Sequence, residues 1–159
     1  TKSHEKHMLH LRTTLPAPTR ALFAQLEAAG QAGNAEWQKA MKTDFYPRYF
    51  CKINPVPADG LAALKHLNWA LCLHFFCSND FAIQGQAAAW DRWDDLPNIA
   101  VPSLVIAGED DLGSTADFSR MAMRLKNATV SIIPAASHMP FHENQAEYFR
   151  ALGDFLLKN

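Results

Sequence analysis

The sequence predicts an α/β fold in which a mostly helical region, residues 1–95, precedes a strand–helix–strand–helix unit, residues 96–159. Apolar residues recur at helical spacing through the first region. The second region holds two short, β-rich apolar runs with a helical pattern between them, which is typical of a parallel βαβ unit. The pattern changes near Pro97.

Three apolar stripes account for the helical region. The first covers residues 22–29 and ends at a glycine, which is a common helix stop. The second covers 37–45, and Pro47 is expected to interrupt it. A proline-rich connector at 54–57 then leads to a third stripe over 61–75, which we expect to form one helix.

Aromatic side chains are dense in the later part of this region. Core packing is the expected reason, and an aromatic roof over a substrate pocket is the alternative. The side chains concerned are Trp69, Phe75, Phe76, Phe81, Trp90 and Trp93.

The second region supplies two predicted strands, at 103–107 and 129–133, with a helix over 118–125 between them and a last helix over 149–156. Two parallel strands alone do not make a stable sheet, and open edges invite aggregation. We therefore expect the missing strands to come from another chain, from another part of a cleaved protein, or from a second copy.

The two predicted strands are followed by residues that can carry chemistry. In parallel sheets, reactive groups gather beyond the carboxyl ends of the strands. Asp111 follows the first strand and His138 follows the second. A carboxylate that binds one ring nitrogen of histidine fixes its tautomer and stabilises the imidazolium, so this pair is the acid–base half of a nucleophilic triad. Asp110 is the alternative acid, and His142 is the alternative base.

Residues 99–111 (IAVPSLVIAGEDD), 137–141 (SHMPF) and 149–157 resemble the C-terminal end of an α/β-hydrolase. In that fold the acid lies in a Gly-x-x-Asp turn and the base in a Gly-His-Met-Pro-like turn. The resemblance assigns Asp111 as the acid and His138 as the base, with a serine in place of the usual glycine before the histidine. It also implies that residues 96–159 are the C-terminal part of the hydrolase core and residues 1–95 its cap.

The helical region resembles the cap of proline iminopeptidases and related tricorn-interacting aminopeptidases. Members of that group hold the ammonium of the substrate with acidic side chains, and the matching positions here are Asp80 and Leu112. Because Leu112 has no charge, an ammonium would lose a partner there, at a cost of about a few kcal/mol. An amide or ester with a less charged acyl side is therefore the expected substrate, and no cofactor is implied. The matching segments are 45–51, 67–68, 78–81, Gly85 and 90–91.

A nucleophile elbow, Gly-x-Ser-x-Gly, is not found around any of the seven glycines. Ser114 follows Gly113 but lacks a second glycine and a preceding strand, so it is a poor candidate nucleophile. We therefore expect an N-terminal hydrolase segment, on a separate or cleaved chain, to supply the serine and the oxyanion hole. The alternatives are a truncated or diverged piece that acts as a binding module, and a sequence that is only part of its gene product.

Composition argues against other classes of protein. A formal net charge of -1 gives no basic excess for nucleic acid. No apolar run approaches the roughly 20 residues of a membrane span, and the first residues lack the apolar core of a signal peptide, so we expect a cytoplasmic protein.

The cysteines and the N-terminal histidines are expected to play structural roles only. Cys51, Cys72 and Cys77 form an odd set, which indicates reduced, buried thiols rather than a disulfide framework. The histidines at three-residue spacing are expected on a solvated helix, with a metal site as the alternative. They are His4, His7 and His10.

Overall fold

A computed structural model describes residues 2–76 and 79–159 of the chain. The chain divides into two compact units. The helical unit comprises Thr1–Arg48 and Asn54–Trp90, and the sheet unit comprises Tyr49–Ile53 and Asp91–Asn159. The short segment Tyr49–Ile53 thus groups with the sheet unit, although the residues on either side of it belong to the helical unit.

The helical unit is built on a cluster of buried aromatic rings. Phe23 lies with its ring centroid 4.3 Å from that of Trp37 and 5.4 Å from that of Phe81. Phe45 packs edge-on against Phe81 at 5.2 Å. All four side chains are almost completely buried, so this cluster forms the core of the unit. The elements of the unit are α1 (Lys2–Thr13), α2 (Ala17–Ala28), α3 (Ala35–Ala40), η1 (Met41–Phe45), α4 (Tyr46–Tyr49, whose last residue groups with the sheet unit), α5 (Ala58–Lys65), α6 (Trp69–Phe76) and η2 (Gln86–Ala89).

Pro47 does not interrupt its helix, contrary to the sequence prediction. The helical run continues through the π-helical turn η1 into α4, where Pro47 lies. The N–H of Tyr46 donates to the carbonyl of Met41, five residues earlier. This wider turn immediately before Pro47 relieves the clash that a proline ring makes with an ordinary α-helix.

The predicted single helix over residues 61–75 is also wrong, because two helices, α5 and α6, divide it. The side chain of Asn68 accepts a hydrogen bond from the N–H of Leu71 at 3.1 Å. An asparagine in this position satisfies a helix N-terminus and so starts a new helix.

Several aromatic side chains that were expected in the core are exposed. Phe81 is buried as predicted, but Trp69, Phe76 and Trp90 expose 58%, 52% and 62% of their surface. Phe75 is exposed as well, and Trp93 is half-buried beneath the Arg120 guanidinium. Core packing therefore explains only part of the aromatic density.

The prediction of buried thiols holds for one cysteine. Cys51 is buried, whereas Cys72 is half-buried. Cys77, like Ser78 in the segment that resembles the aminopeptidase cap, lies outside the described residues.

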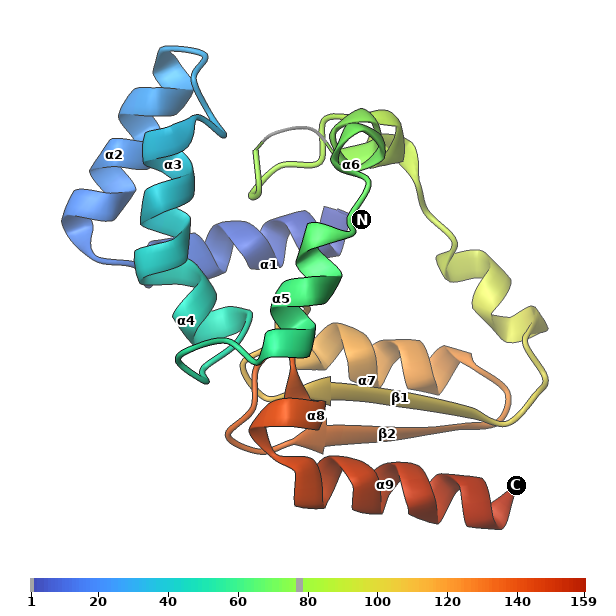
Figure 1. Cartoon of the computed structure of the whole chain (residues 1–159). Coiled ribbons are helices and arrows are strands. Elements are labelled where there is room, and N and C mark those ends of the chain that lie inside the picture. Colours follow the sequence, from blue (N-terminus) through green and yellow to red (C-terminus); the bar gives the residue numbers. More distant parts are fainter. Residues whose placement is uncertain (1, 77–78) are drawn as a thin grey trace. The chain divides into compact units, whose positions relative to one another are not determined.

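The sheet unit has the predicted strand–helix–strand–helix order. Its two strands pair in parallel, from Ser103 opposite Ala128 to Gly108 opposite Ile133. Figure 1 shows α7 and α9 on opposite sides of this strand pair, as the apolar character of the first strand on both faces requires. The elements are η3 (Trp93–Asn98), β1 (Ser103–Gly108), α7 (Thr115–Arg124), β2 (Ala128–Ile133), α8 (Pro140–Glu143) and α9 (Gln145–Lys158).

Within residues 2–76 and 79–159, no helix combines the length and the apolar character that crossing a membrane would require.

Candidate active site

Two turns at the carboxyl ends of the strands form the candidate site. The acid turn, residues 109–113, follows β1, and the base turn, residues 134–139, follows β2. The N–H of Asp110 donates to the carbonyl of Ala136 at 2.9 Å, which joins the turns directly. A Cβ at Gly108 would lie 2.1 Å from the Ser137 carbonyl oxygen, so only glycine permits this close approach.

Asp111 and His138 meet across these turns. Nδ1 of His138 lies 2.8 Å from Oδ1 of Asp111. The carboxylate also accepts longer hydrogen bonds from the N–H groups of Gly108, at 3.4 Å, and Gly113, at 3.3 Å. The Asp111 side chain is 8% exposed and that of His138 is 50% exposed. A buried acid therefore holds an imidazole that is open to solvent on its other side.

The electrostatics of the pair favour an ionised carboxylate beside an imidazole that readily takes a proton. Burial raises the pKa of Asp111, but its hydrogen bond and charge interaction with His138, helped by backbone N–H groups, bring that pKa below its ordinary value. The hydrogen bond to Asp111 raises the pKa of His138 against the opposing effect of burial. Because Asp111 binds Nδ1, the nitrogen that can take a proton from a nucleophile is Nε2.

Segment Tyr49–Ile53 contacts His138 directly. The backbone N–H of His138 donates to the carbonyl of Tyr49 at 3.2 Å. The Phe50 ring lies with its centroid 5.6 Å from that of the His138 ring, tilted by 34°. One neighbouring segment thus fixes both the backbone and the ring of the histidine.

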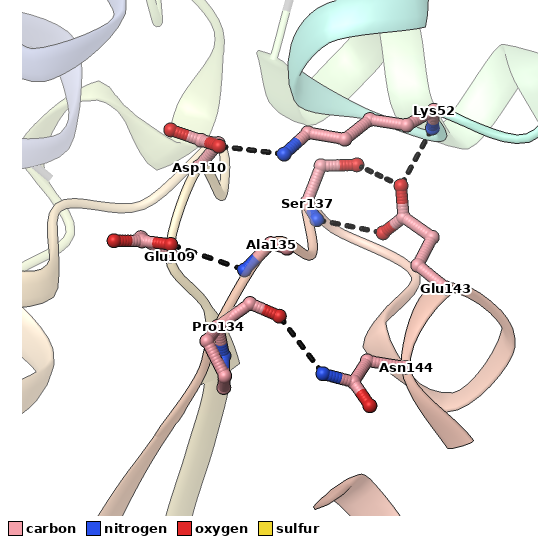
Figure 2. A network of polar contacts seen from close by, with 8 residues as sticks. All are labelled: Lys52, Glu109, Asp110, Pro134, Ala135, Ser137, Glu143 and Asn144. Carbon is pink, nitrogen blue, oxygen red and sulfur yellow. Dashed lines mark hydrogen bonds and ion pairs between the residues drawn. The ribbon is translucent and has the colours of Figure 1, made fainter. Parts of the chain in front are cut away.

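The Glu143 carboxylate binds Ser137 of the base turn and the backbone of Lys52, as Figure 2 shows. It accepts hydrogen bonds from the N–H of Ser137 at 2.7 Å, from the Ser137 hydroxyl at 2.7 Å, and from the N–H of Lys52 at 2.6 Å. The sequence analysis missed Glu143. A glutamate six positions after Ser137 carries no signal that separates it from an ordinary solvated helix residue.

The rival acid and base take other partners. Asp110 forms an ion pair with Nζ of Lys52 at 2.6 Å and is largely exposed (Figure 2). His142 is half-buried in α8, and its ring lies 4.7 Å from that of Phe141. The aspartate whose carboxylate contacts the His138 ring is Asp111. Ser114, the weak candidate nucleophile, accepts from the N–H of Asp117 and so caps α7.

The predicted substrate-binding residues lie one in each unit. In the helical unit, Oδ2 of Asp80 accepts from the indole N–H of Trp37 at 2.8 Å, and Oδ1 accepts from the Tyr46 hydroxyl at 3.4 Å. Burial raises the pKa of Asp80, and these hydrogen bonds act against that rise. Leu112 lies in the sheet unit, half-buried and directly after Asp111. Their role in substrate binding stays a prediction.

The N-terminal histidines lie along α1, where the rings of His7 and His10 are 6.4 Å apart between centroids. Across the part of the chain that the structure describes, no group of three or more His, Cys, Asp or Glu residues is arranged to hold a metal ion.

Comparisons with known proteins place the chain among related sequences. The chain is 27% identical to a proline iminopeptidase of Thermoplasma volcanium over 155 residues, which is 97% of this chain and 52% of that protein. It is 26% identical to a proline iminopeptidase of Flavobacterium johnsoniae over 82% of this chain and 44% of that protein. The chain therefore spans about half the length of the curated relatives it matches.

Solved structures give the same result. The crystal structure of a proline iminopeptidase from Mycobacterium smegmatis superimposes with a TM-score of 0.81 at 28% identity, over 98% of this chain and 52% of that one. The crystal structure of VinJ superimposes with a TM-score of 0.88 at 25% identity, over 98% and 53%. A model of the Alpha/beta hydrolase family matches residues 9–151. The chain belongs to the alpha/beta hydrolase family.

Proposed function

We propose that this chain provides the cap and the C-terminal core of a serine hydrolase that resembles proline iminopeptidase and cleaves an amide or ester bond through an acyl-enzyme. The observation that carries the proposal is the 2.8 Å contact between Nδ1 of His138 and Oδ1 of the buried Asp111. This contact leaves Nε2 to act as the proton acceptor, which is the arrangement of the acid–base half of a triad.

In the proposed reaction, a serine outside these 159 residues attacks the acyl carbon while Nε2 of His138 takes the hydroxyl proton. The same proton then passes to the leaving amine or alcohol as its bond to the acyl carbon breaks. A water molecule attacks the acyl-enzyme in the second half, giving its proton to His138, which returns it to the serine. Asp111 stays ionised and stabilises the imidazolium in both halves.

The segment that bears the serine is proposed to complete the sheet. Among the described residues the sheet has two strands, so each of them has one edge without a strand beside it. Such edges are normally covered. An N-terminal hydrolase segment with the Gly-x-Ser-x-Gly elbow, on a separate or cleaved chain or on the same longer protein, would cover them and bring the nucleophile.

The substrate is proposed to be a peptide or small molecule whose acyl side carries little positive charge. Asp80 is the acidic group offered by the helical unit, and hydrogen bonds from Trp37 and Tyr46 already engage its carboxylate. Leu112 stands where the related aminopeptidases have a second acid. Both features weaken the recognition of a free ammonium.

Fluorophosphonate labelling of the protein purified from its native host tests this function. With the chain tagged, we expect the probe to label a serine in a Gly-x-Ser-x-Gly sequence outside these residues. The change His138→Gln should slow labelling about 10³-fold or more, because the serine loses its base. His142→Gln is the matched control and should label at the rate of the unmodified protein.

Two outcomes would count against the proposal. Equal labelling rates in the His138→Gln and unmodified proteins would show that the imidazole does not activate the serine. Purified material in which no labelled serine occurs would favour the alternative, a non-catalytic binding module that uses the open edges of the sheet. Intact mass under denaturing conditions identifies the polypeptide that carries the label.

A further inference from the structure

One carboxylate accepts three hydrogen bonds next to the candidate base in the chain. Glu143 accepts from the N–H and the hydroxyl of Ser137 and from the N–H of Lys52, all at 2.6–2.7 Å. Ser137 is fully buried. Hydrogen bonds to an ionised acceptor are short and strong, so this carboxylate is a firm anchor for the groups that it binds.

These contacts form a closed ring that runs from Glu143 through Ser137 and His138 to segment Tyr49–Ile53 and back to Glu143. Glu143 holds the residue before it, and the carbonyl of Tyr49 accepts from the N–H of His138 itself. Tyr49 lies three residues before Lys52, whose N–H returns to Glu143. The backbone of the base turn is thereby fixed to segment Tyr49–Ile53 at two consecutive residues.

We propose that Glu143 is a positioning residue for His138, which holds the base turn against segment Tyr49–Ile53 and sets the direction in which Nε2 points. This inference rests on the proposed function. It also accounts for the departure at position 137, where the related hydrolases have glycine: the Ser137 hydroxyl adds a third donor to the Glu143 carboxylate.

The charge of Glu143 has a second effect, because it helps to raise the pKa of His138. The titratable and charged groups around the base turn come from three elements. They are Glu109, Asp110 and Asp111 on the acid turn, Tyr49, Cys51 and Lys52 in segment Tyr49–Ile53, and His142 and Glu143 on α8.

The change Glu143→Gln tests the proposal with little change in volume. The glutamine oxygen can still accept hydrogen bonds, but its NH₂ group would face the N–H of Ser137, donor against donor. In the complex purified from its native host, with p-nitrophenyl acetate as the probe, we expect kcat to fall about 10- to 100-fold with KM almost unchanged. We also expect the pKa of His138, followed by NMR of the imidazole carbons, to fall.

Three further variants separate positioning from general stability. Glu147→Gln on α9 is the matched control, and it should leave kcat and the titration of His138 unchanged. Ser137→Ala removes one of the three donors and keeps the charge, so it should lower kcat slightly and leave the pKa of His138 in place. Glu143→Asp retains the charge on a shorter side chain and should restore part of the loss. Thermal unfolding is recorded for each variant.

The proposal is overturned if Glu143→Gln leaves both kcat and the titration of His138 unchanged, or if it lowers kcat only in proportion to lost folded protein. The NMR titration does not require activity. If the unmodified complex hydrolyses no probe, the proposed function fails, and an unaltered titration in Glu143→Gln would independently refute the positioning role.

Discussion

In the proposed reaction, Asp111 is the buried member of the catalytic pair and His138 is the exposed one. The Asp111 carboxylate is held by the backbone N–H groups of Gly108 and Gly113, and the backbone of His138 is held by the carbonyl of Tyr49. The two side chains are therefore already in contact before a proton is transferred, so the site needs little reorganisation during the reaction.

The same pair predicts how stability depends on pH. The folded pKa of His138 is raised, so its contribution is full below its ordinary value of 6.5 and is lost as pH rises through the folded pKa. The folded pKa of Asp111 is lowered, so its contribution is full above its ordinary value of 3.8 and is lost as pH falls through the folded pKa. Asp111→Asn should therefore lower the urea midpoint most between pH 3.8 and 6.5. A midpoint difference that does not vary with pH would contradict this.

At the residue scale, the sequence pattern predicted that Asp111 and His138 lie together, but it did not predict the contacts of Glu143. Asp111 and His138 could be found because each follows a recognisable strand and because both turns match a known pattern. Glu143 could not, since its role depends on three donors, one of which lies 91 residues away in the chain. The preference for Asp111 over Asp110 was a sequence prediction, and the structure shows why position in the turn matters: Asp110 faces Lys52 instead.

At the scale of elements, the N-terminus of α7 allows a test of whether Ser114 is a helix cap or the nucleophile. Its Oγ accepts from the N–H of Asp117 at 3.1 Å and caps the helix. Ser114→Ala should lower the free energy of unfolding by about 1 kcal/mol and leave the rate of fluorophosphonate labelling unchanged. Chemical denaturation measures the first effect. Loss of labelling in a variant that remains folded would instead identify Ser114 as the nucleophile.

The spacing of apolar residues predicted the strands and helices well where the buried side chains recur with the period of the element. The strands and α7 lie close to their predicted positions, because strand-length apolar runs and helical spacing differ clearly. Pro47 and Asn68 show the limit of such patterns. A π-helical turn accommodates the proline, and one side-chain hydrogen bond begins α6 inside a continuous apolar stripe. Both outcomes depend on geometry that residue types alone do not encode.

At the scale of the whole molecule, the open edges of β1 and β2 predict self-association. Strand edges that have no strand beside them, as in the two-stranded sheet of the described residues, are templates for pairing with other chains. The 159-residue chain produced alone should therefore have a mass above 17.7 kDa in light scattering. Co-production with the segment that bears Gly-x-Ser-x-Gly should remove the larger species. A lone chain that stays monomeric at high concentration would argue against an incomplete sheet.

Segment Tyr49–Ile53 makes the sheet unit discontinuous in sequence, and this limits how the protein can be divided. A truncation that starts at Asp91 would keep both catalytic candidates and every strand. It would also delete the acceptor of the His138 N–H and one donor to Glu143. A fusion or library that exchanges the helical unit should therefore graft residues 49–53 back in place, since swapping everything before Asp91 as one cassette discards part of the scaffold that orients the histidine.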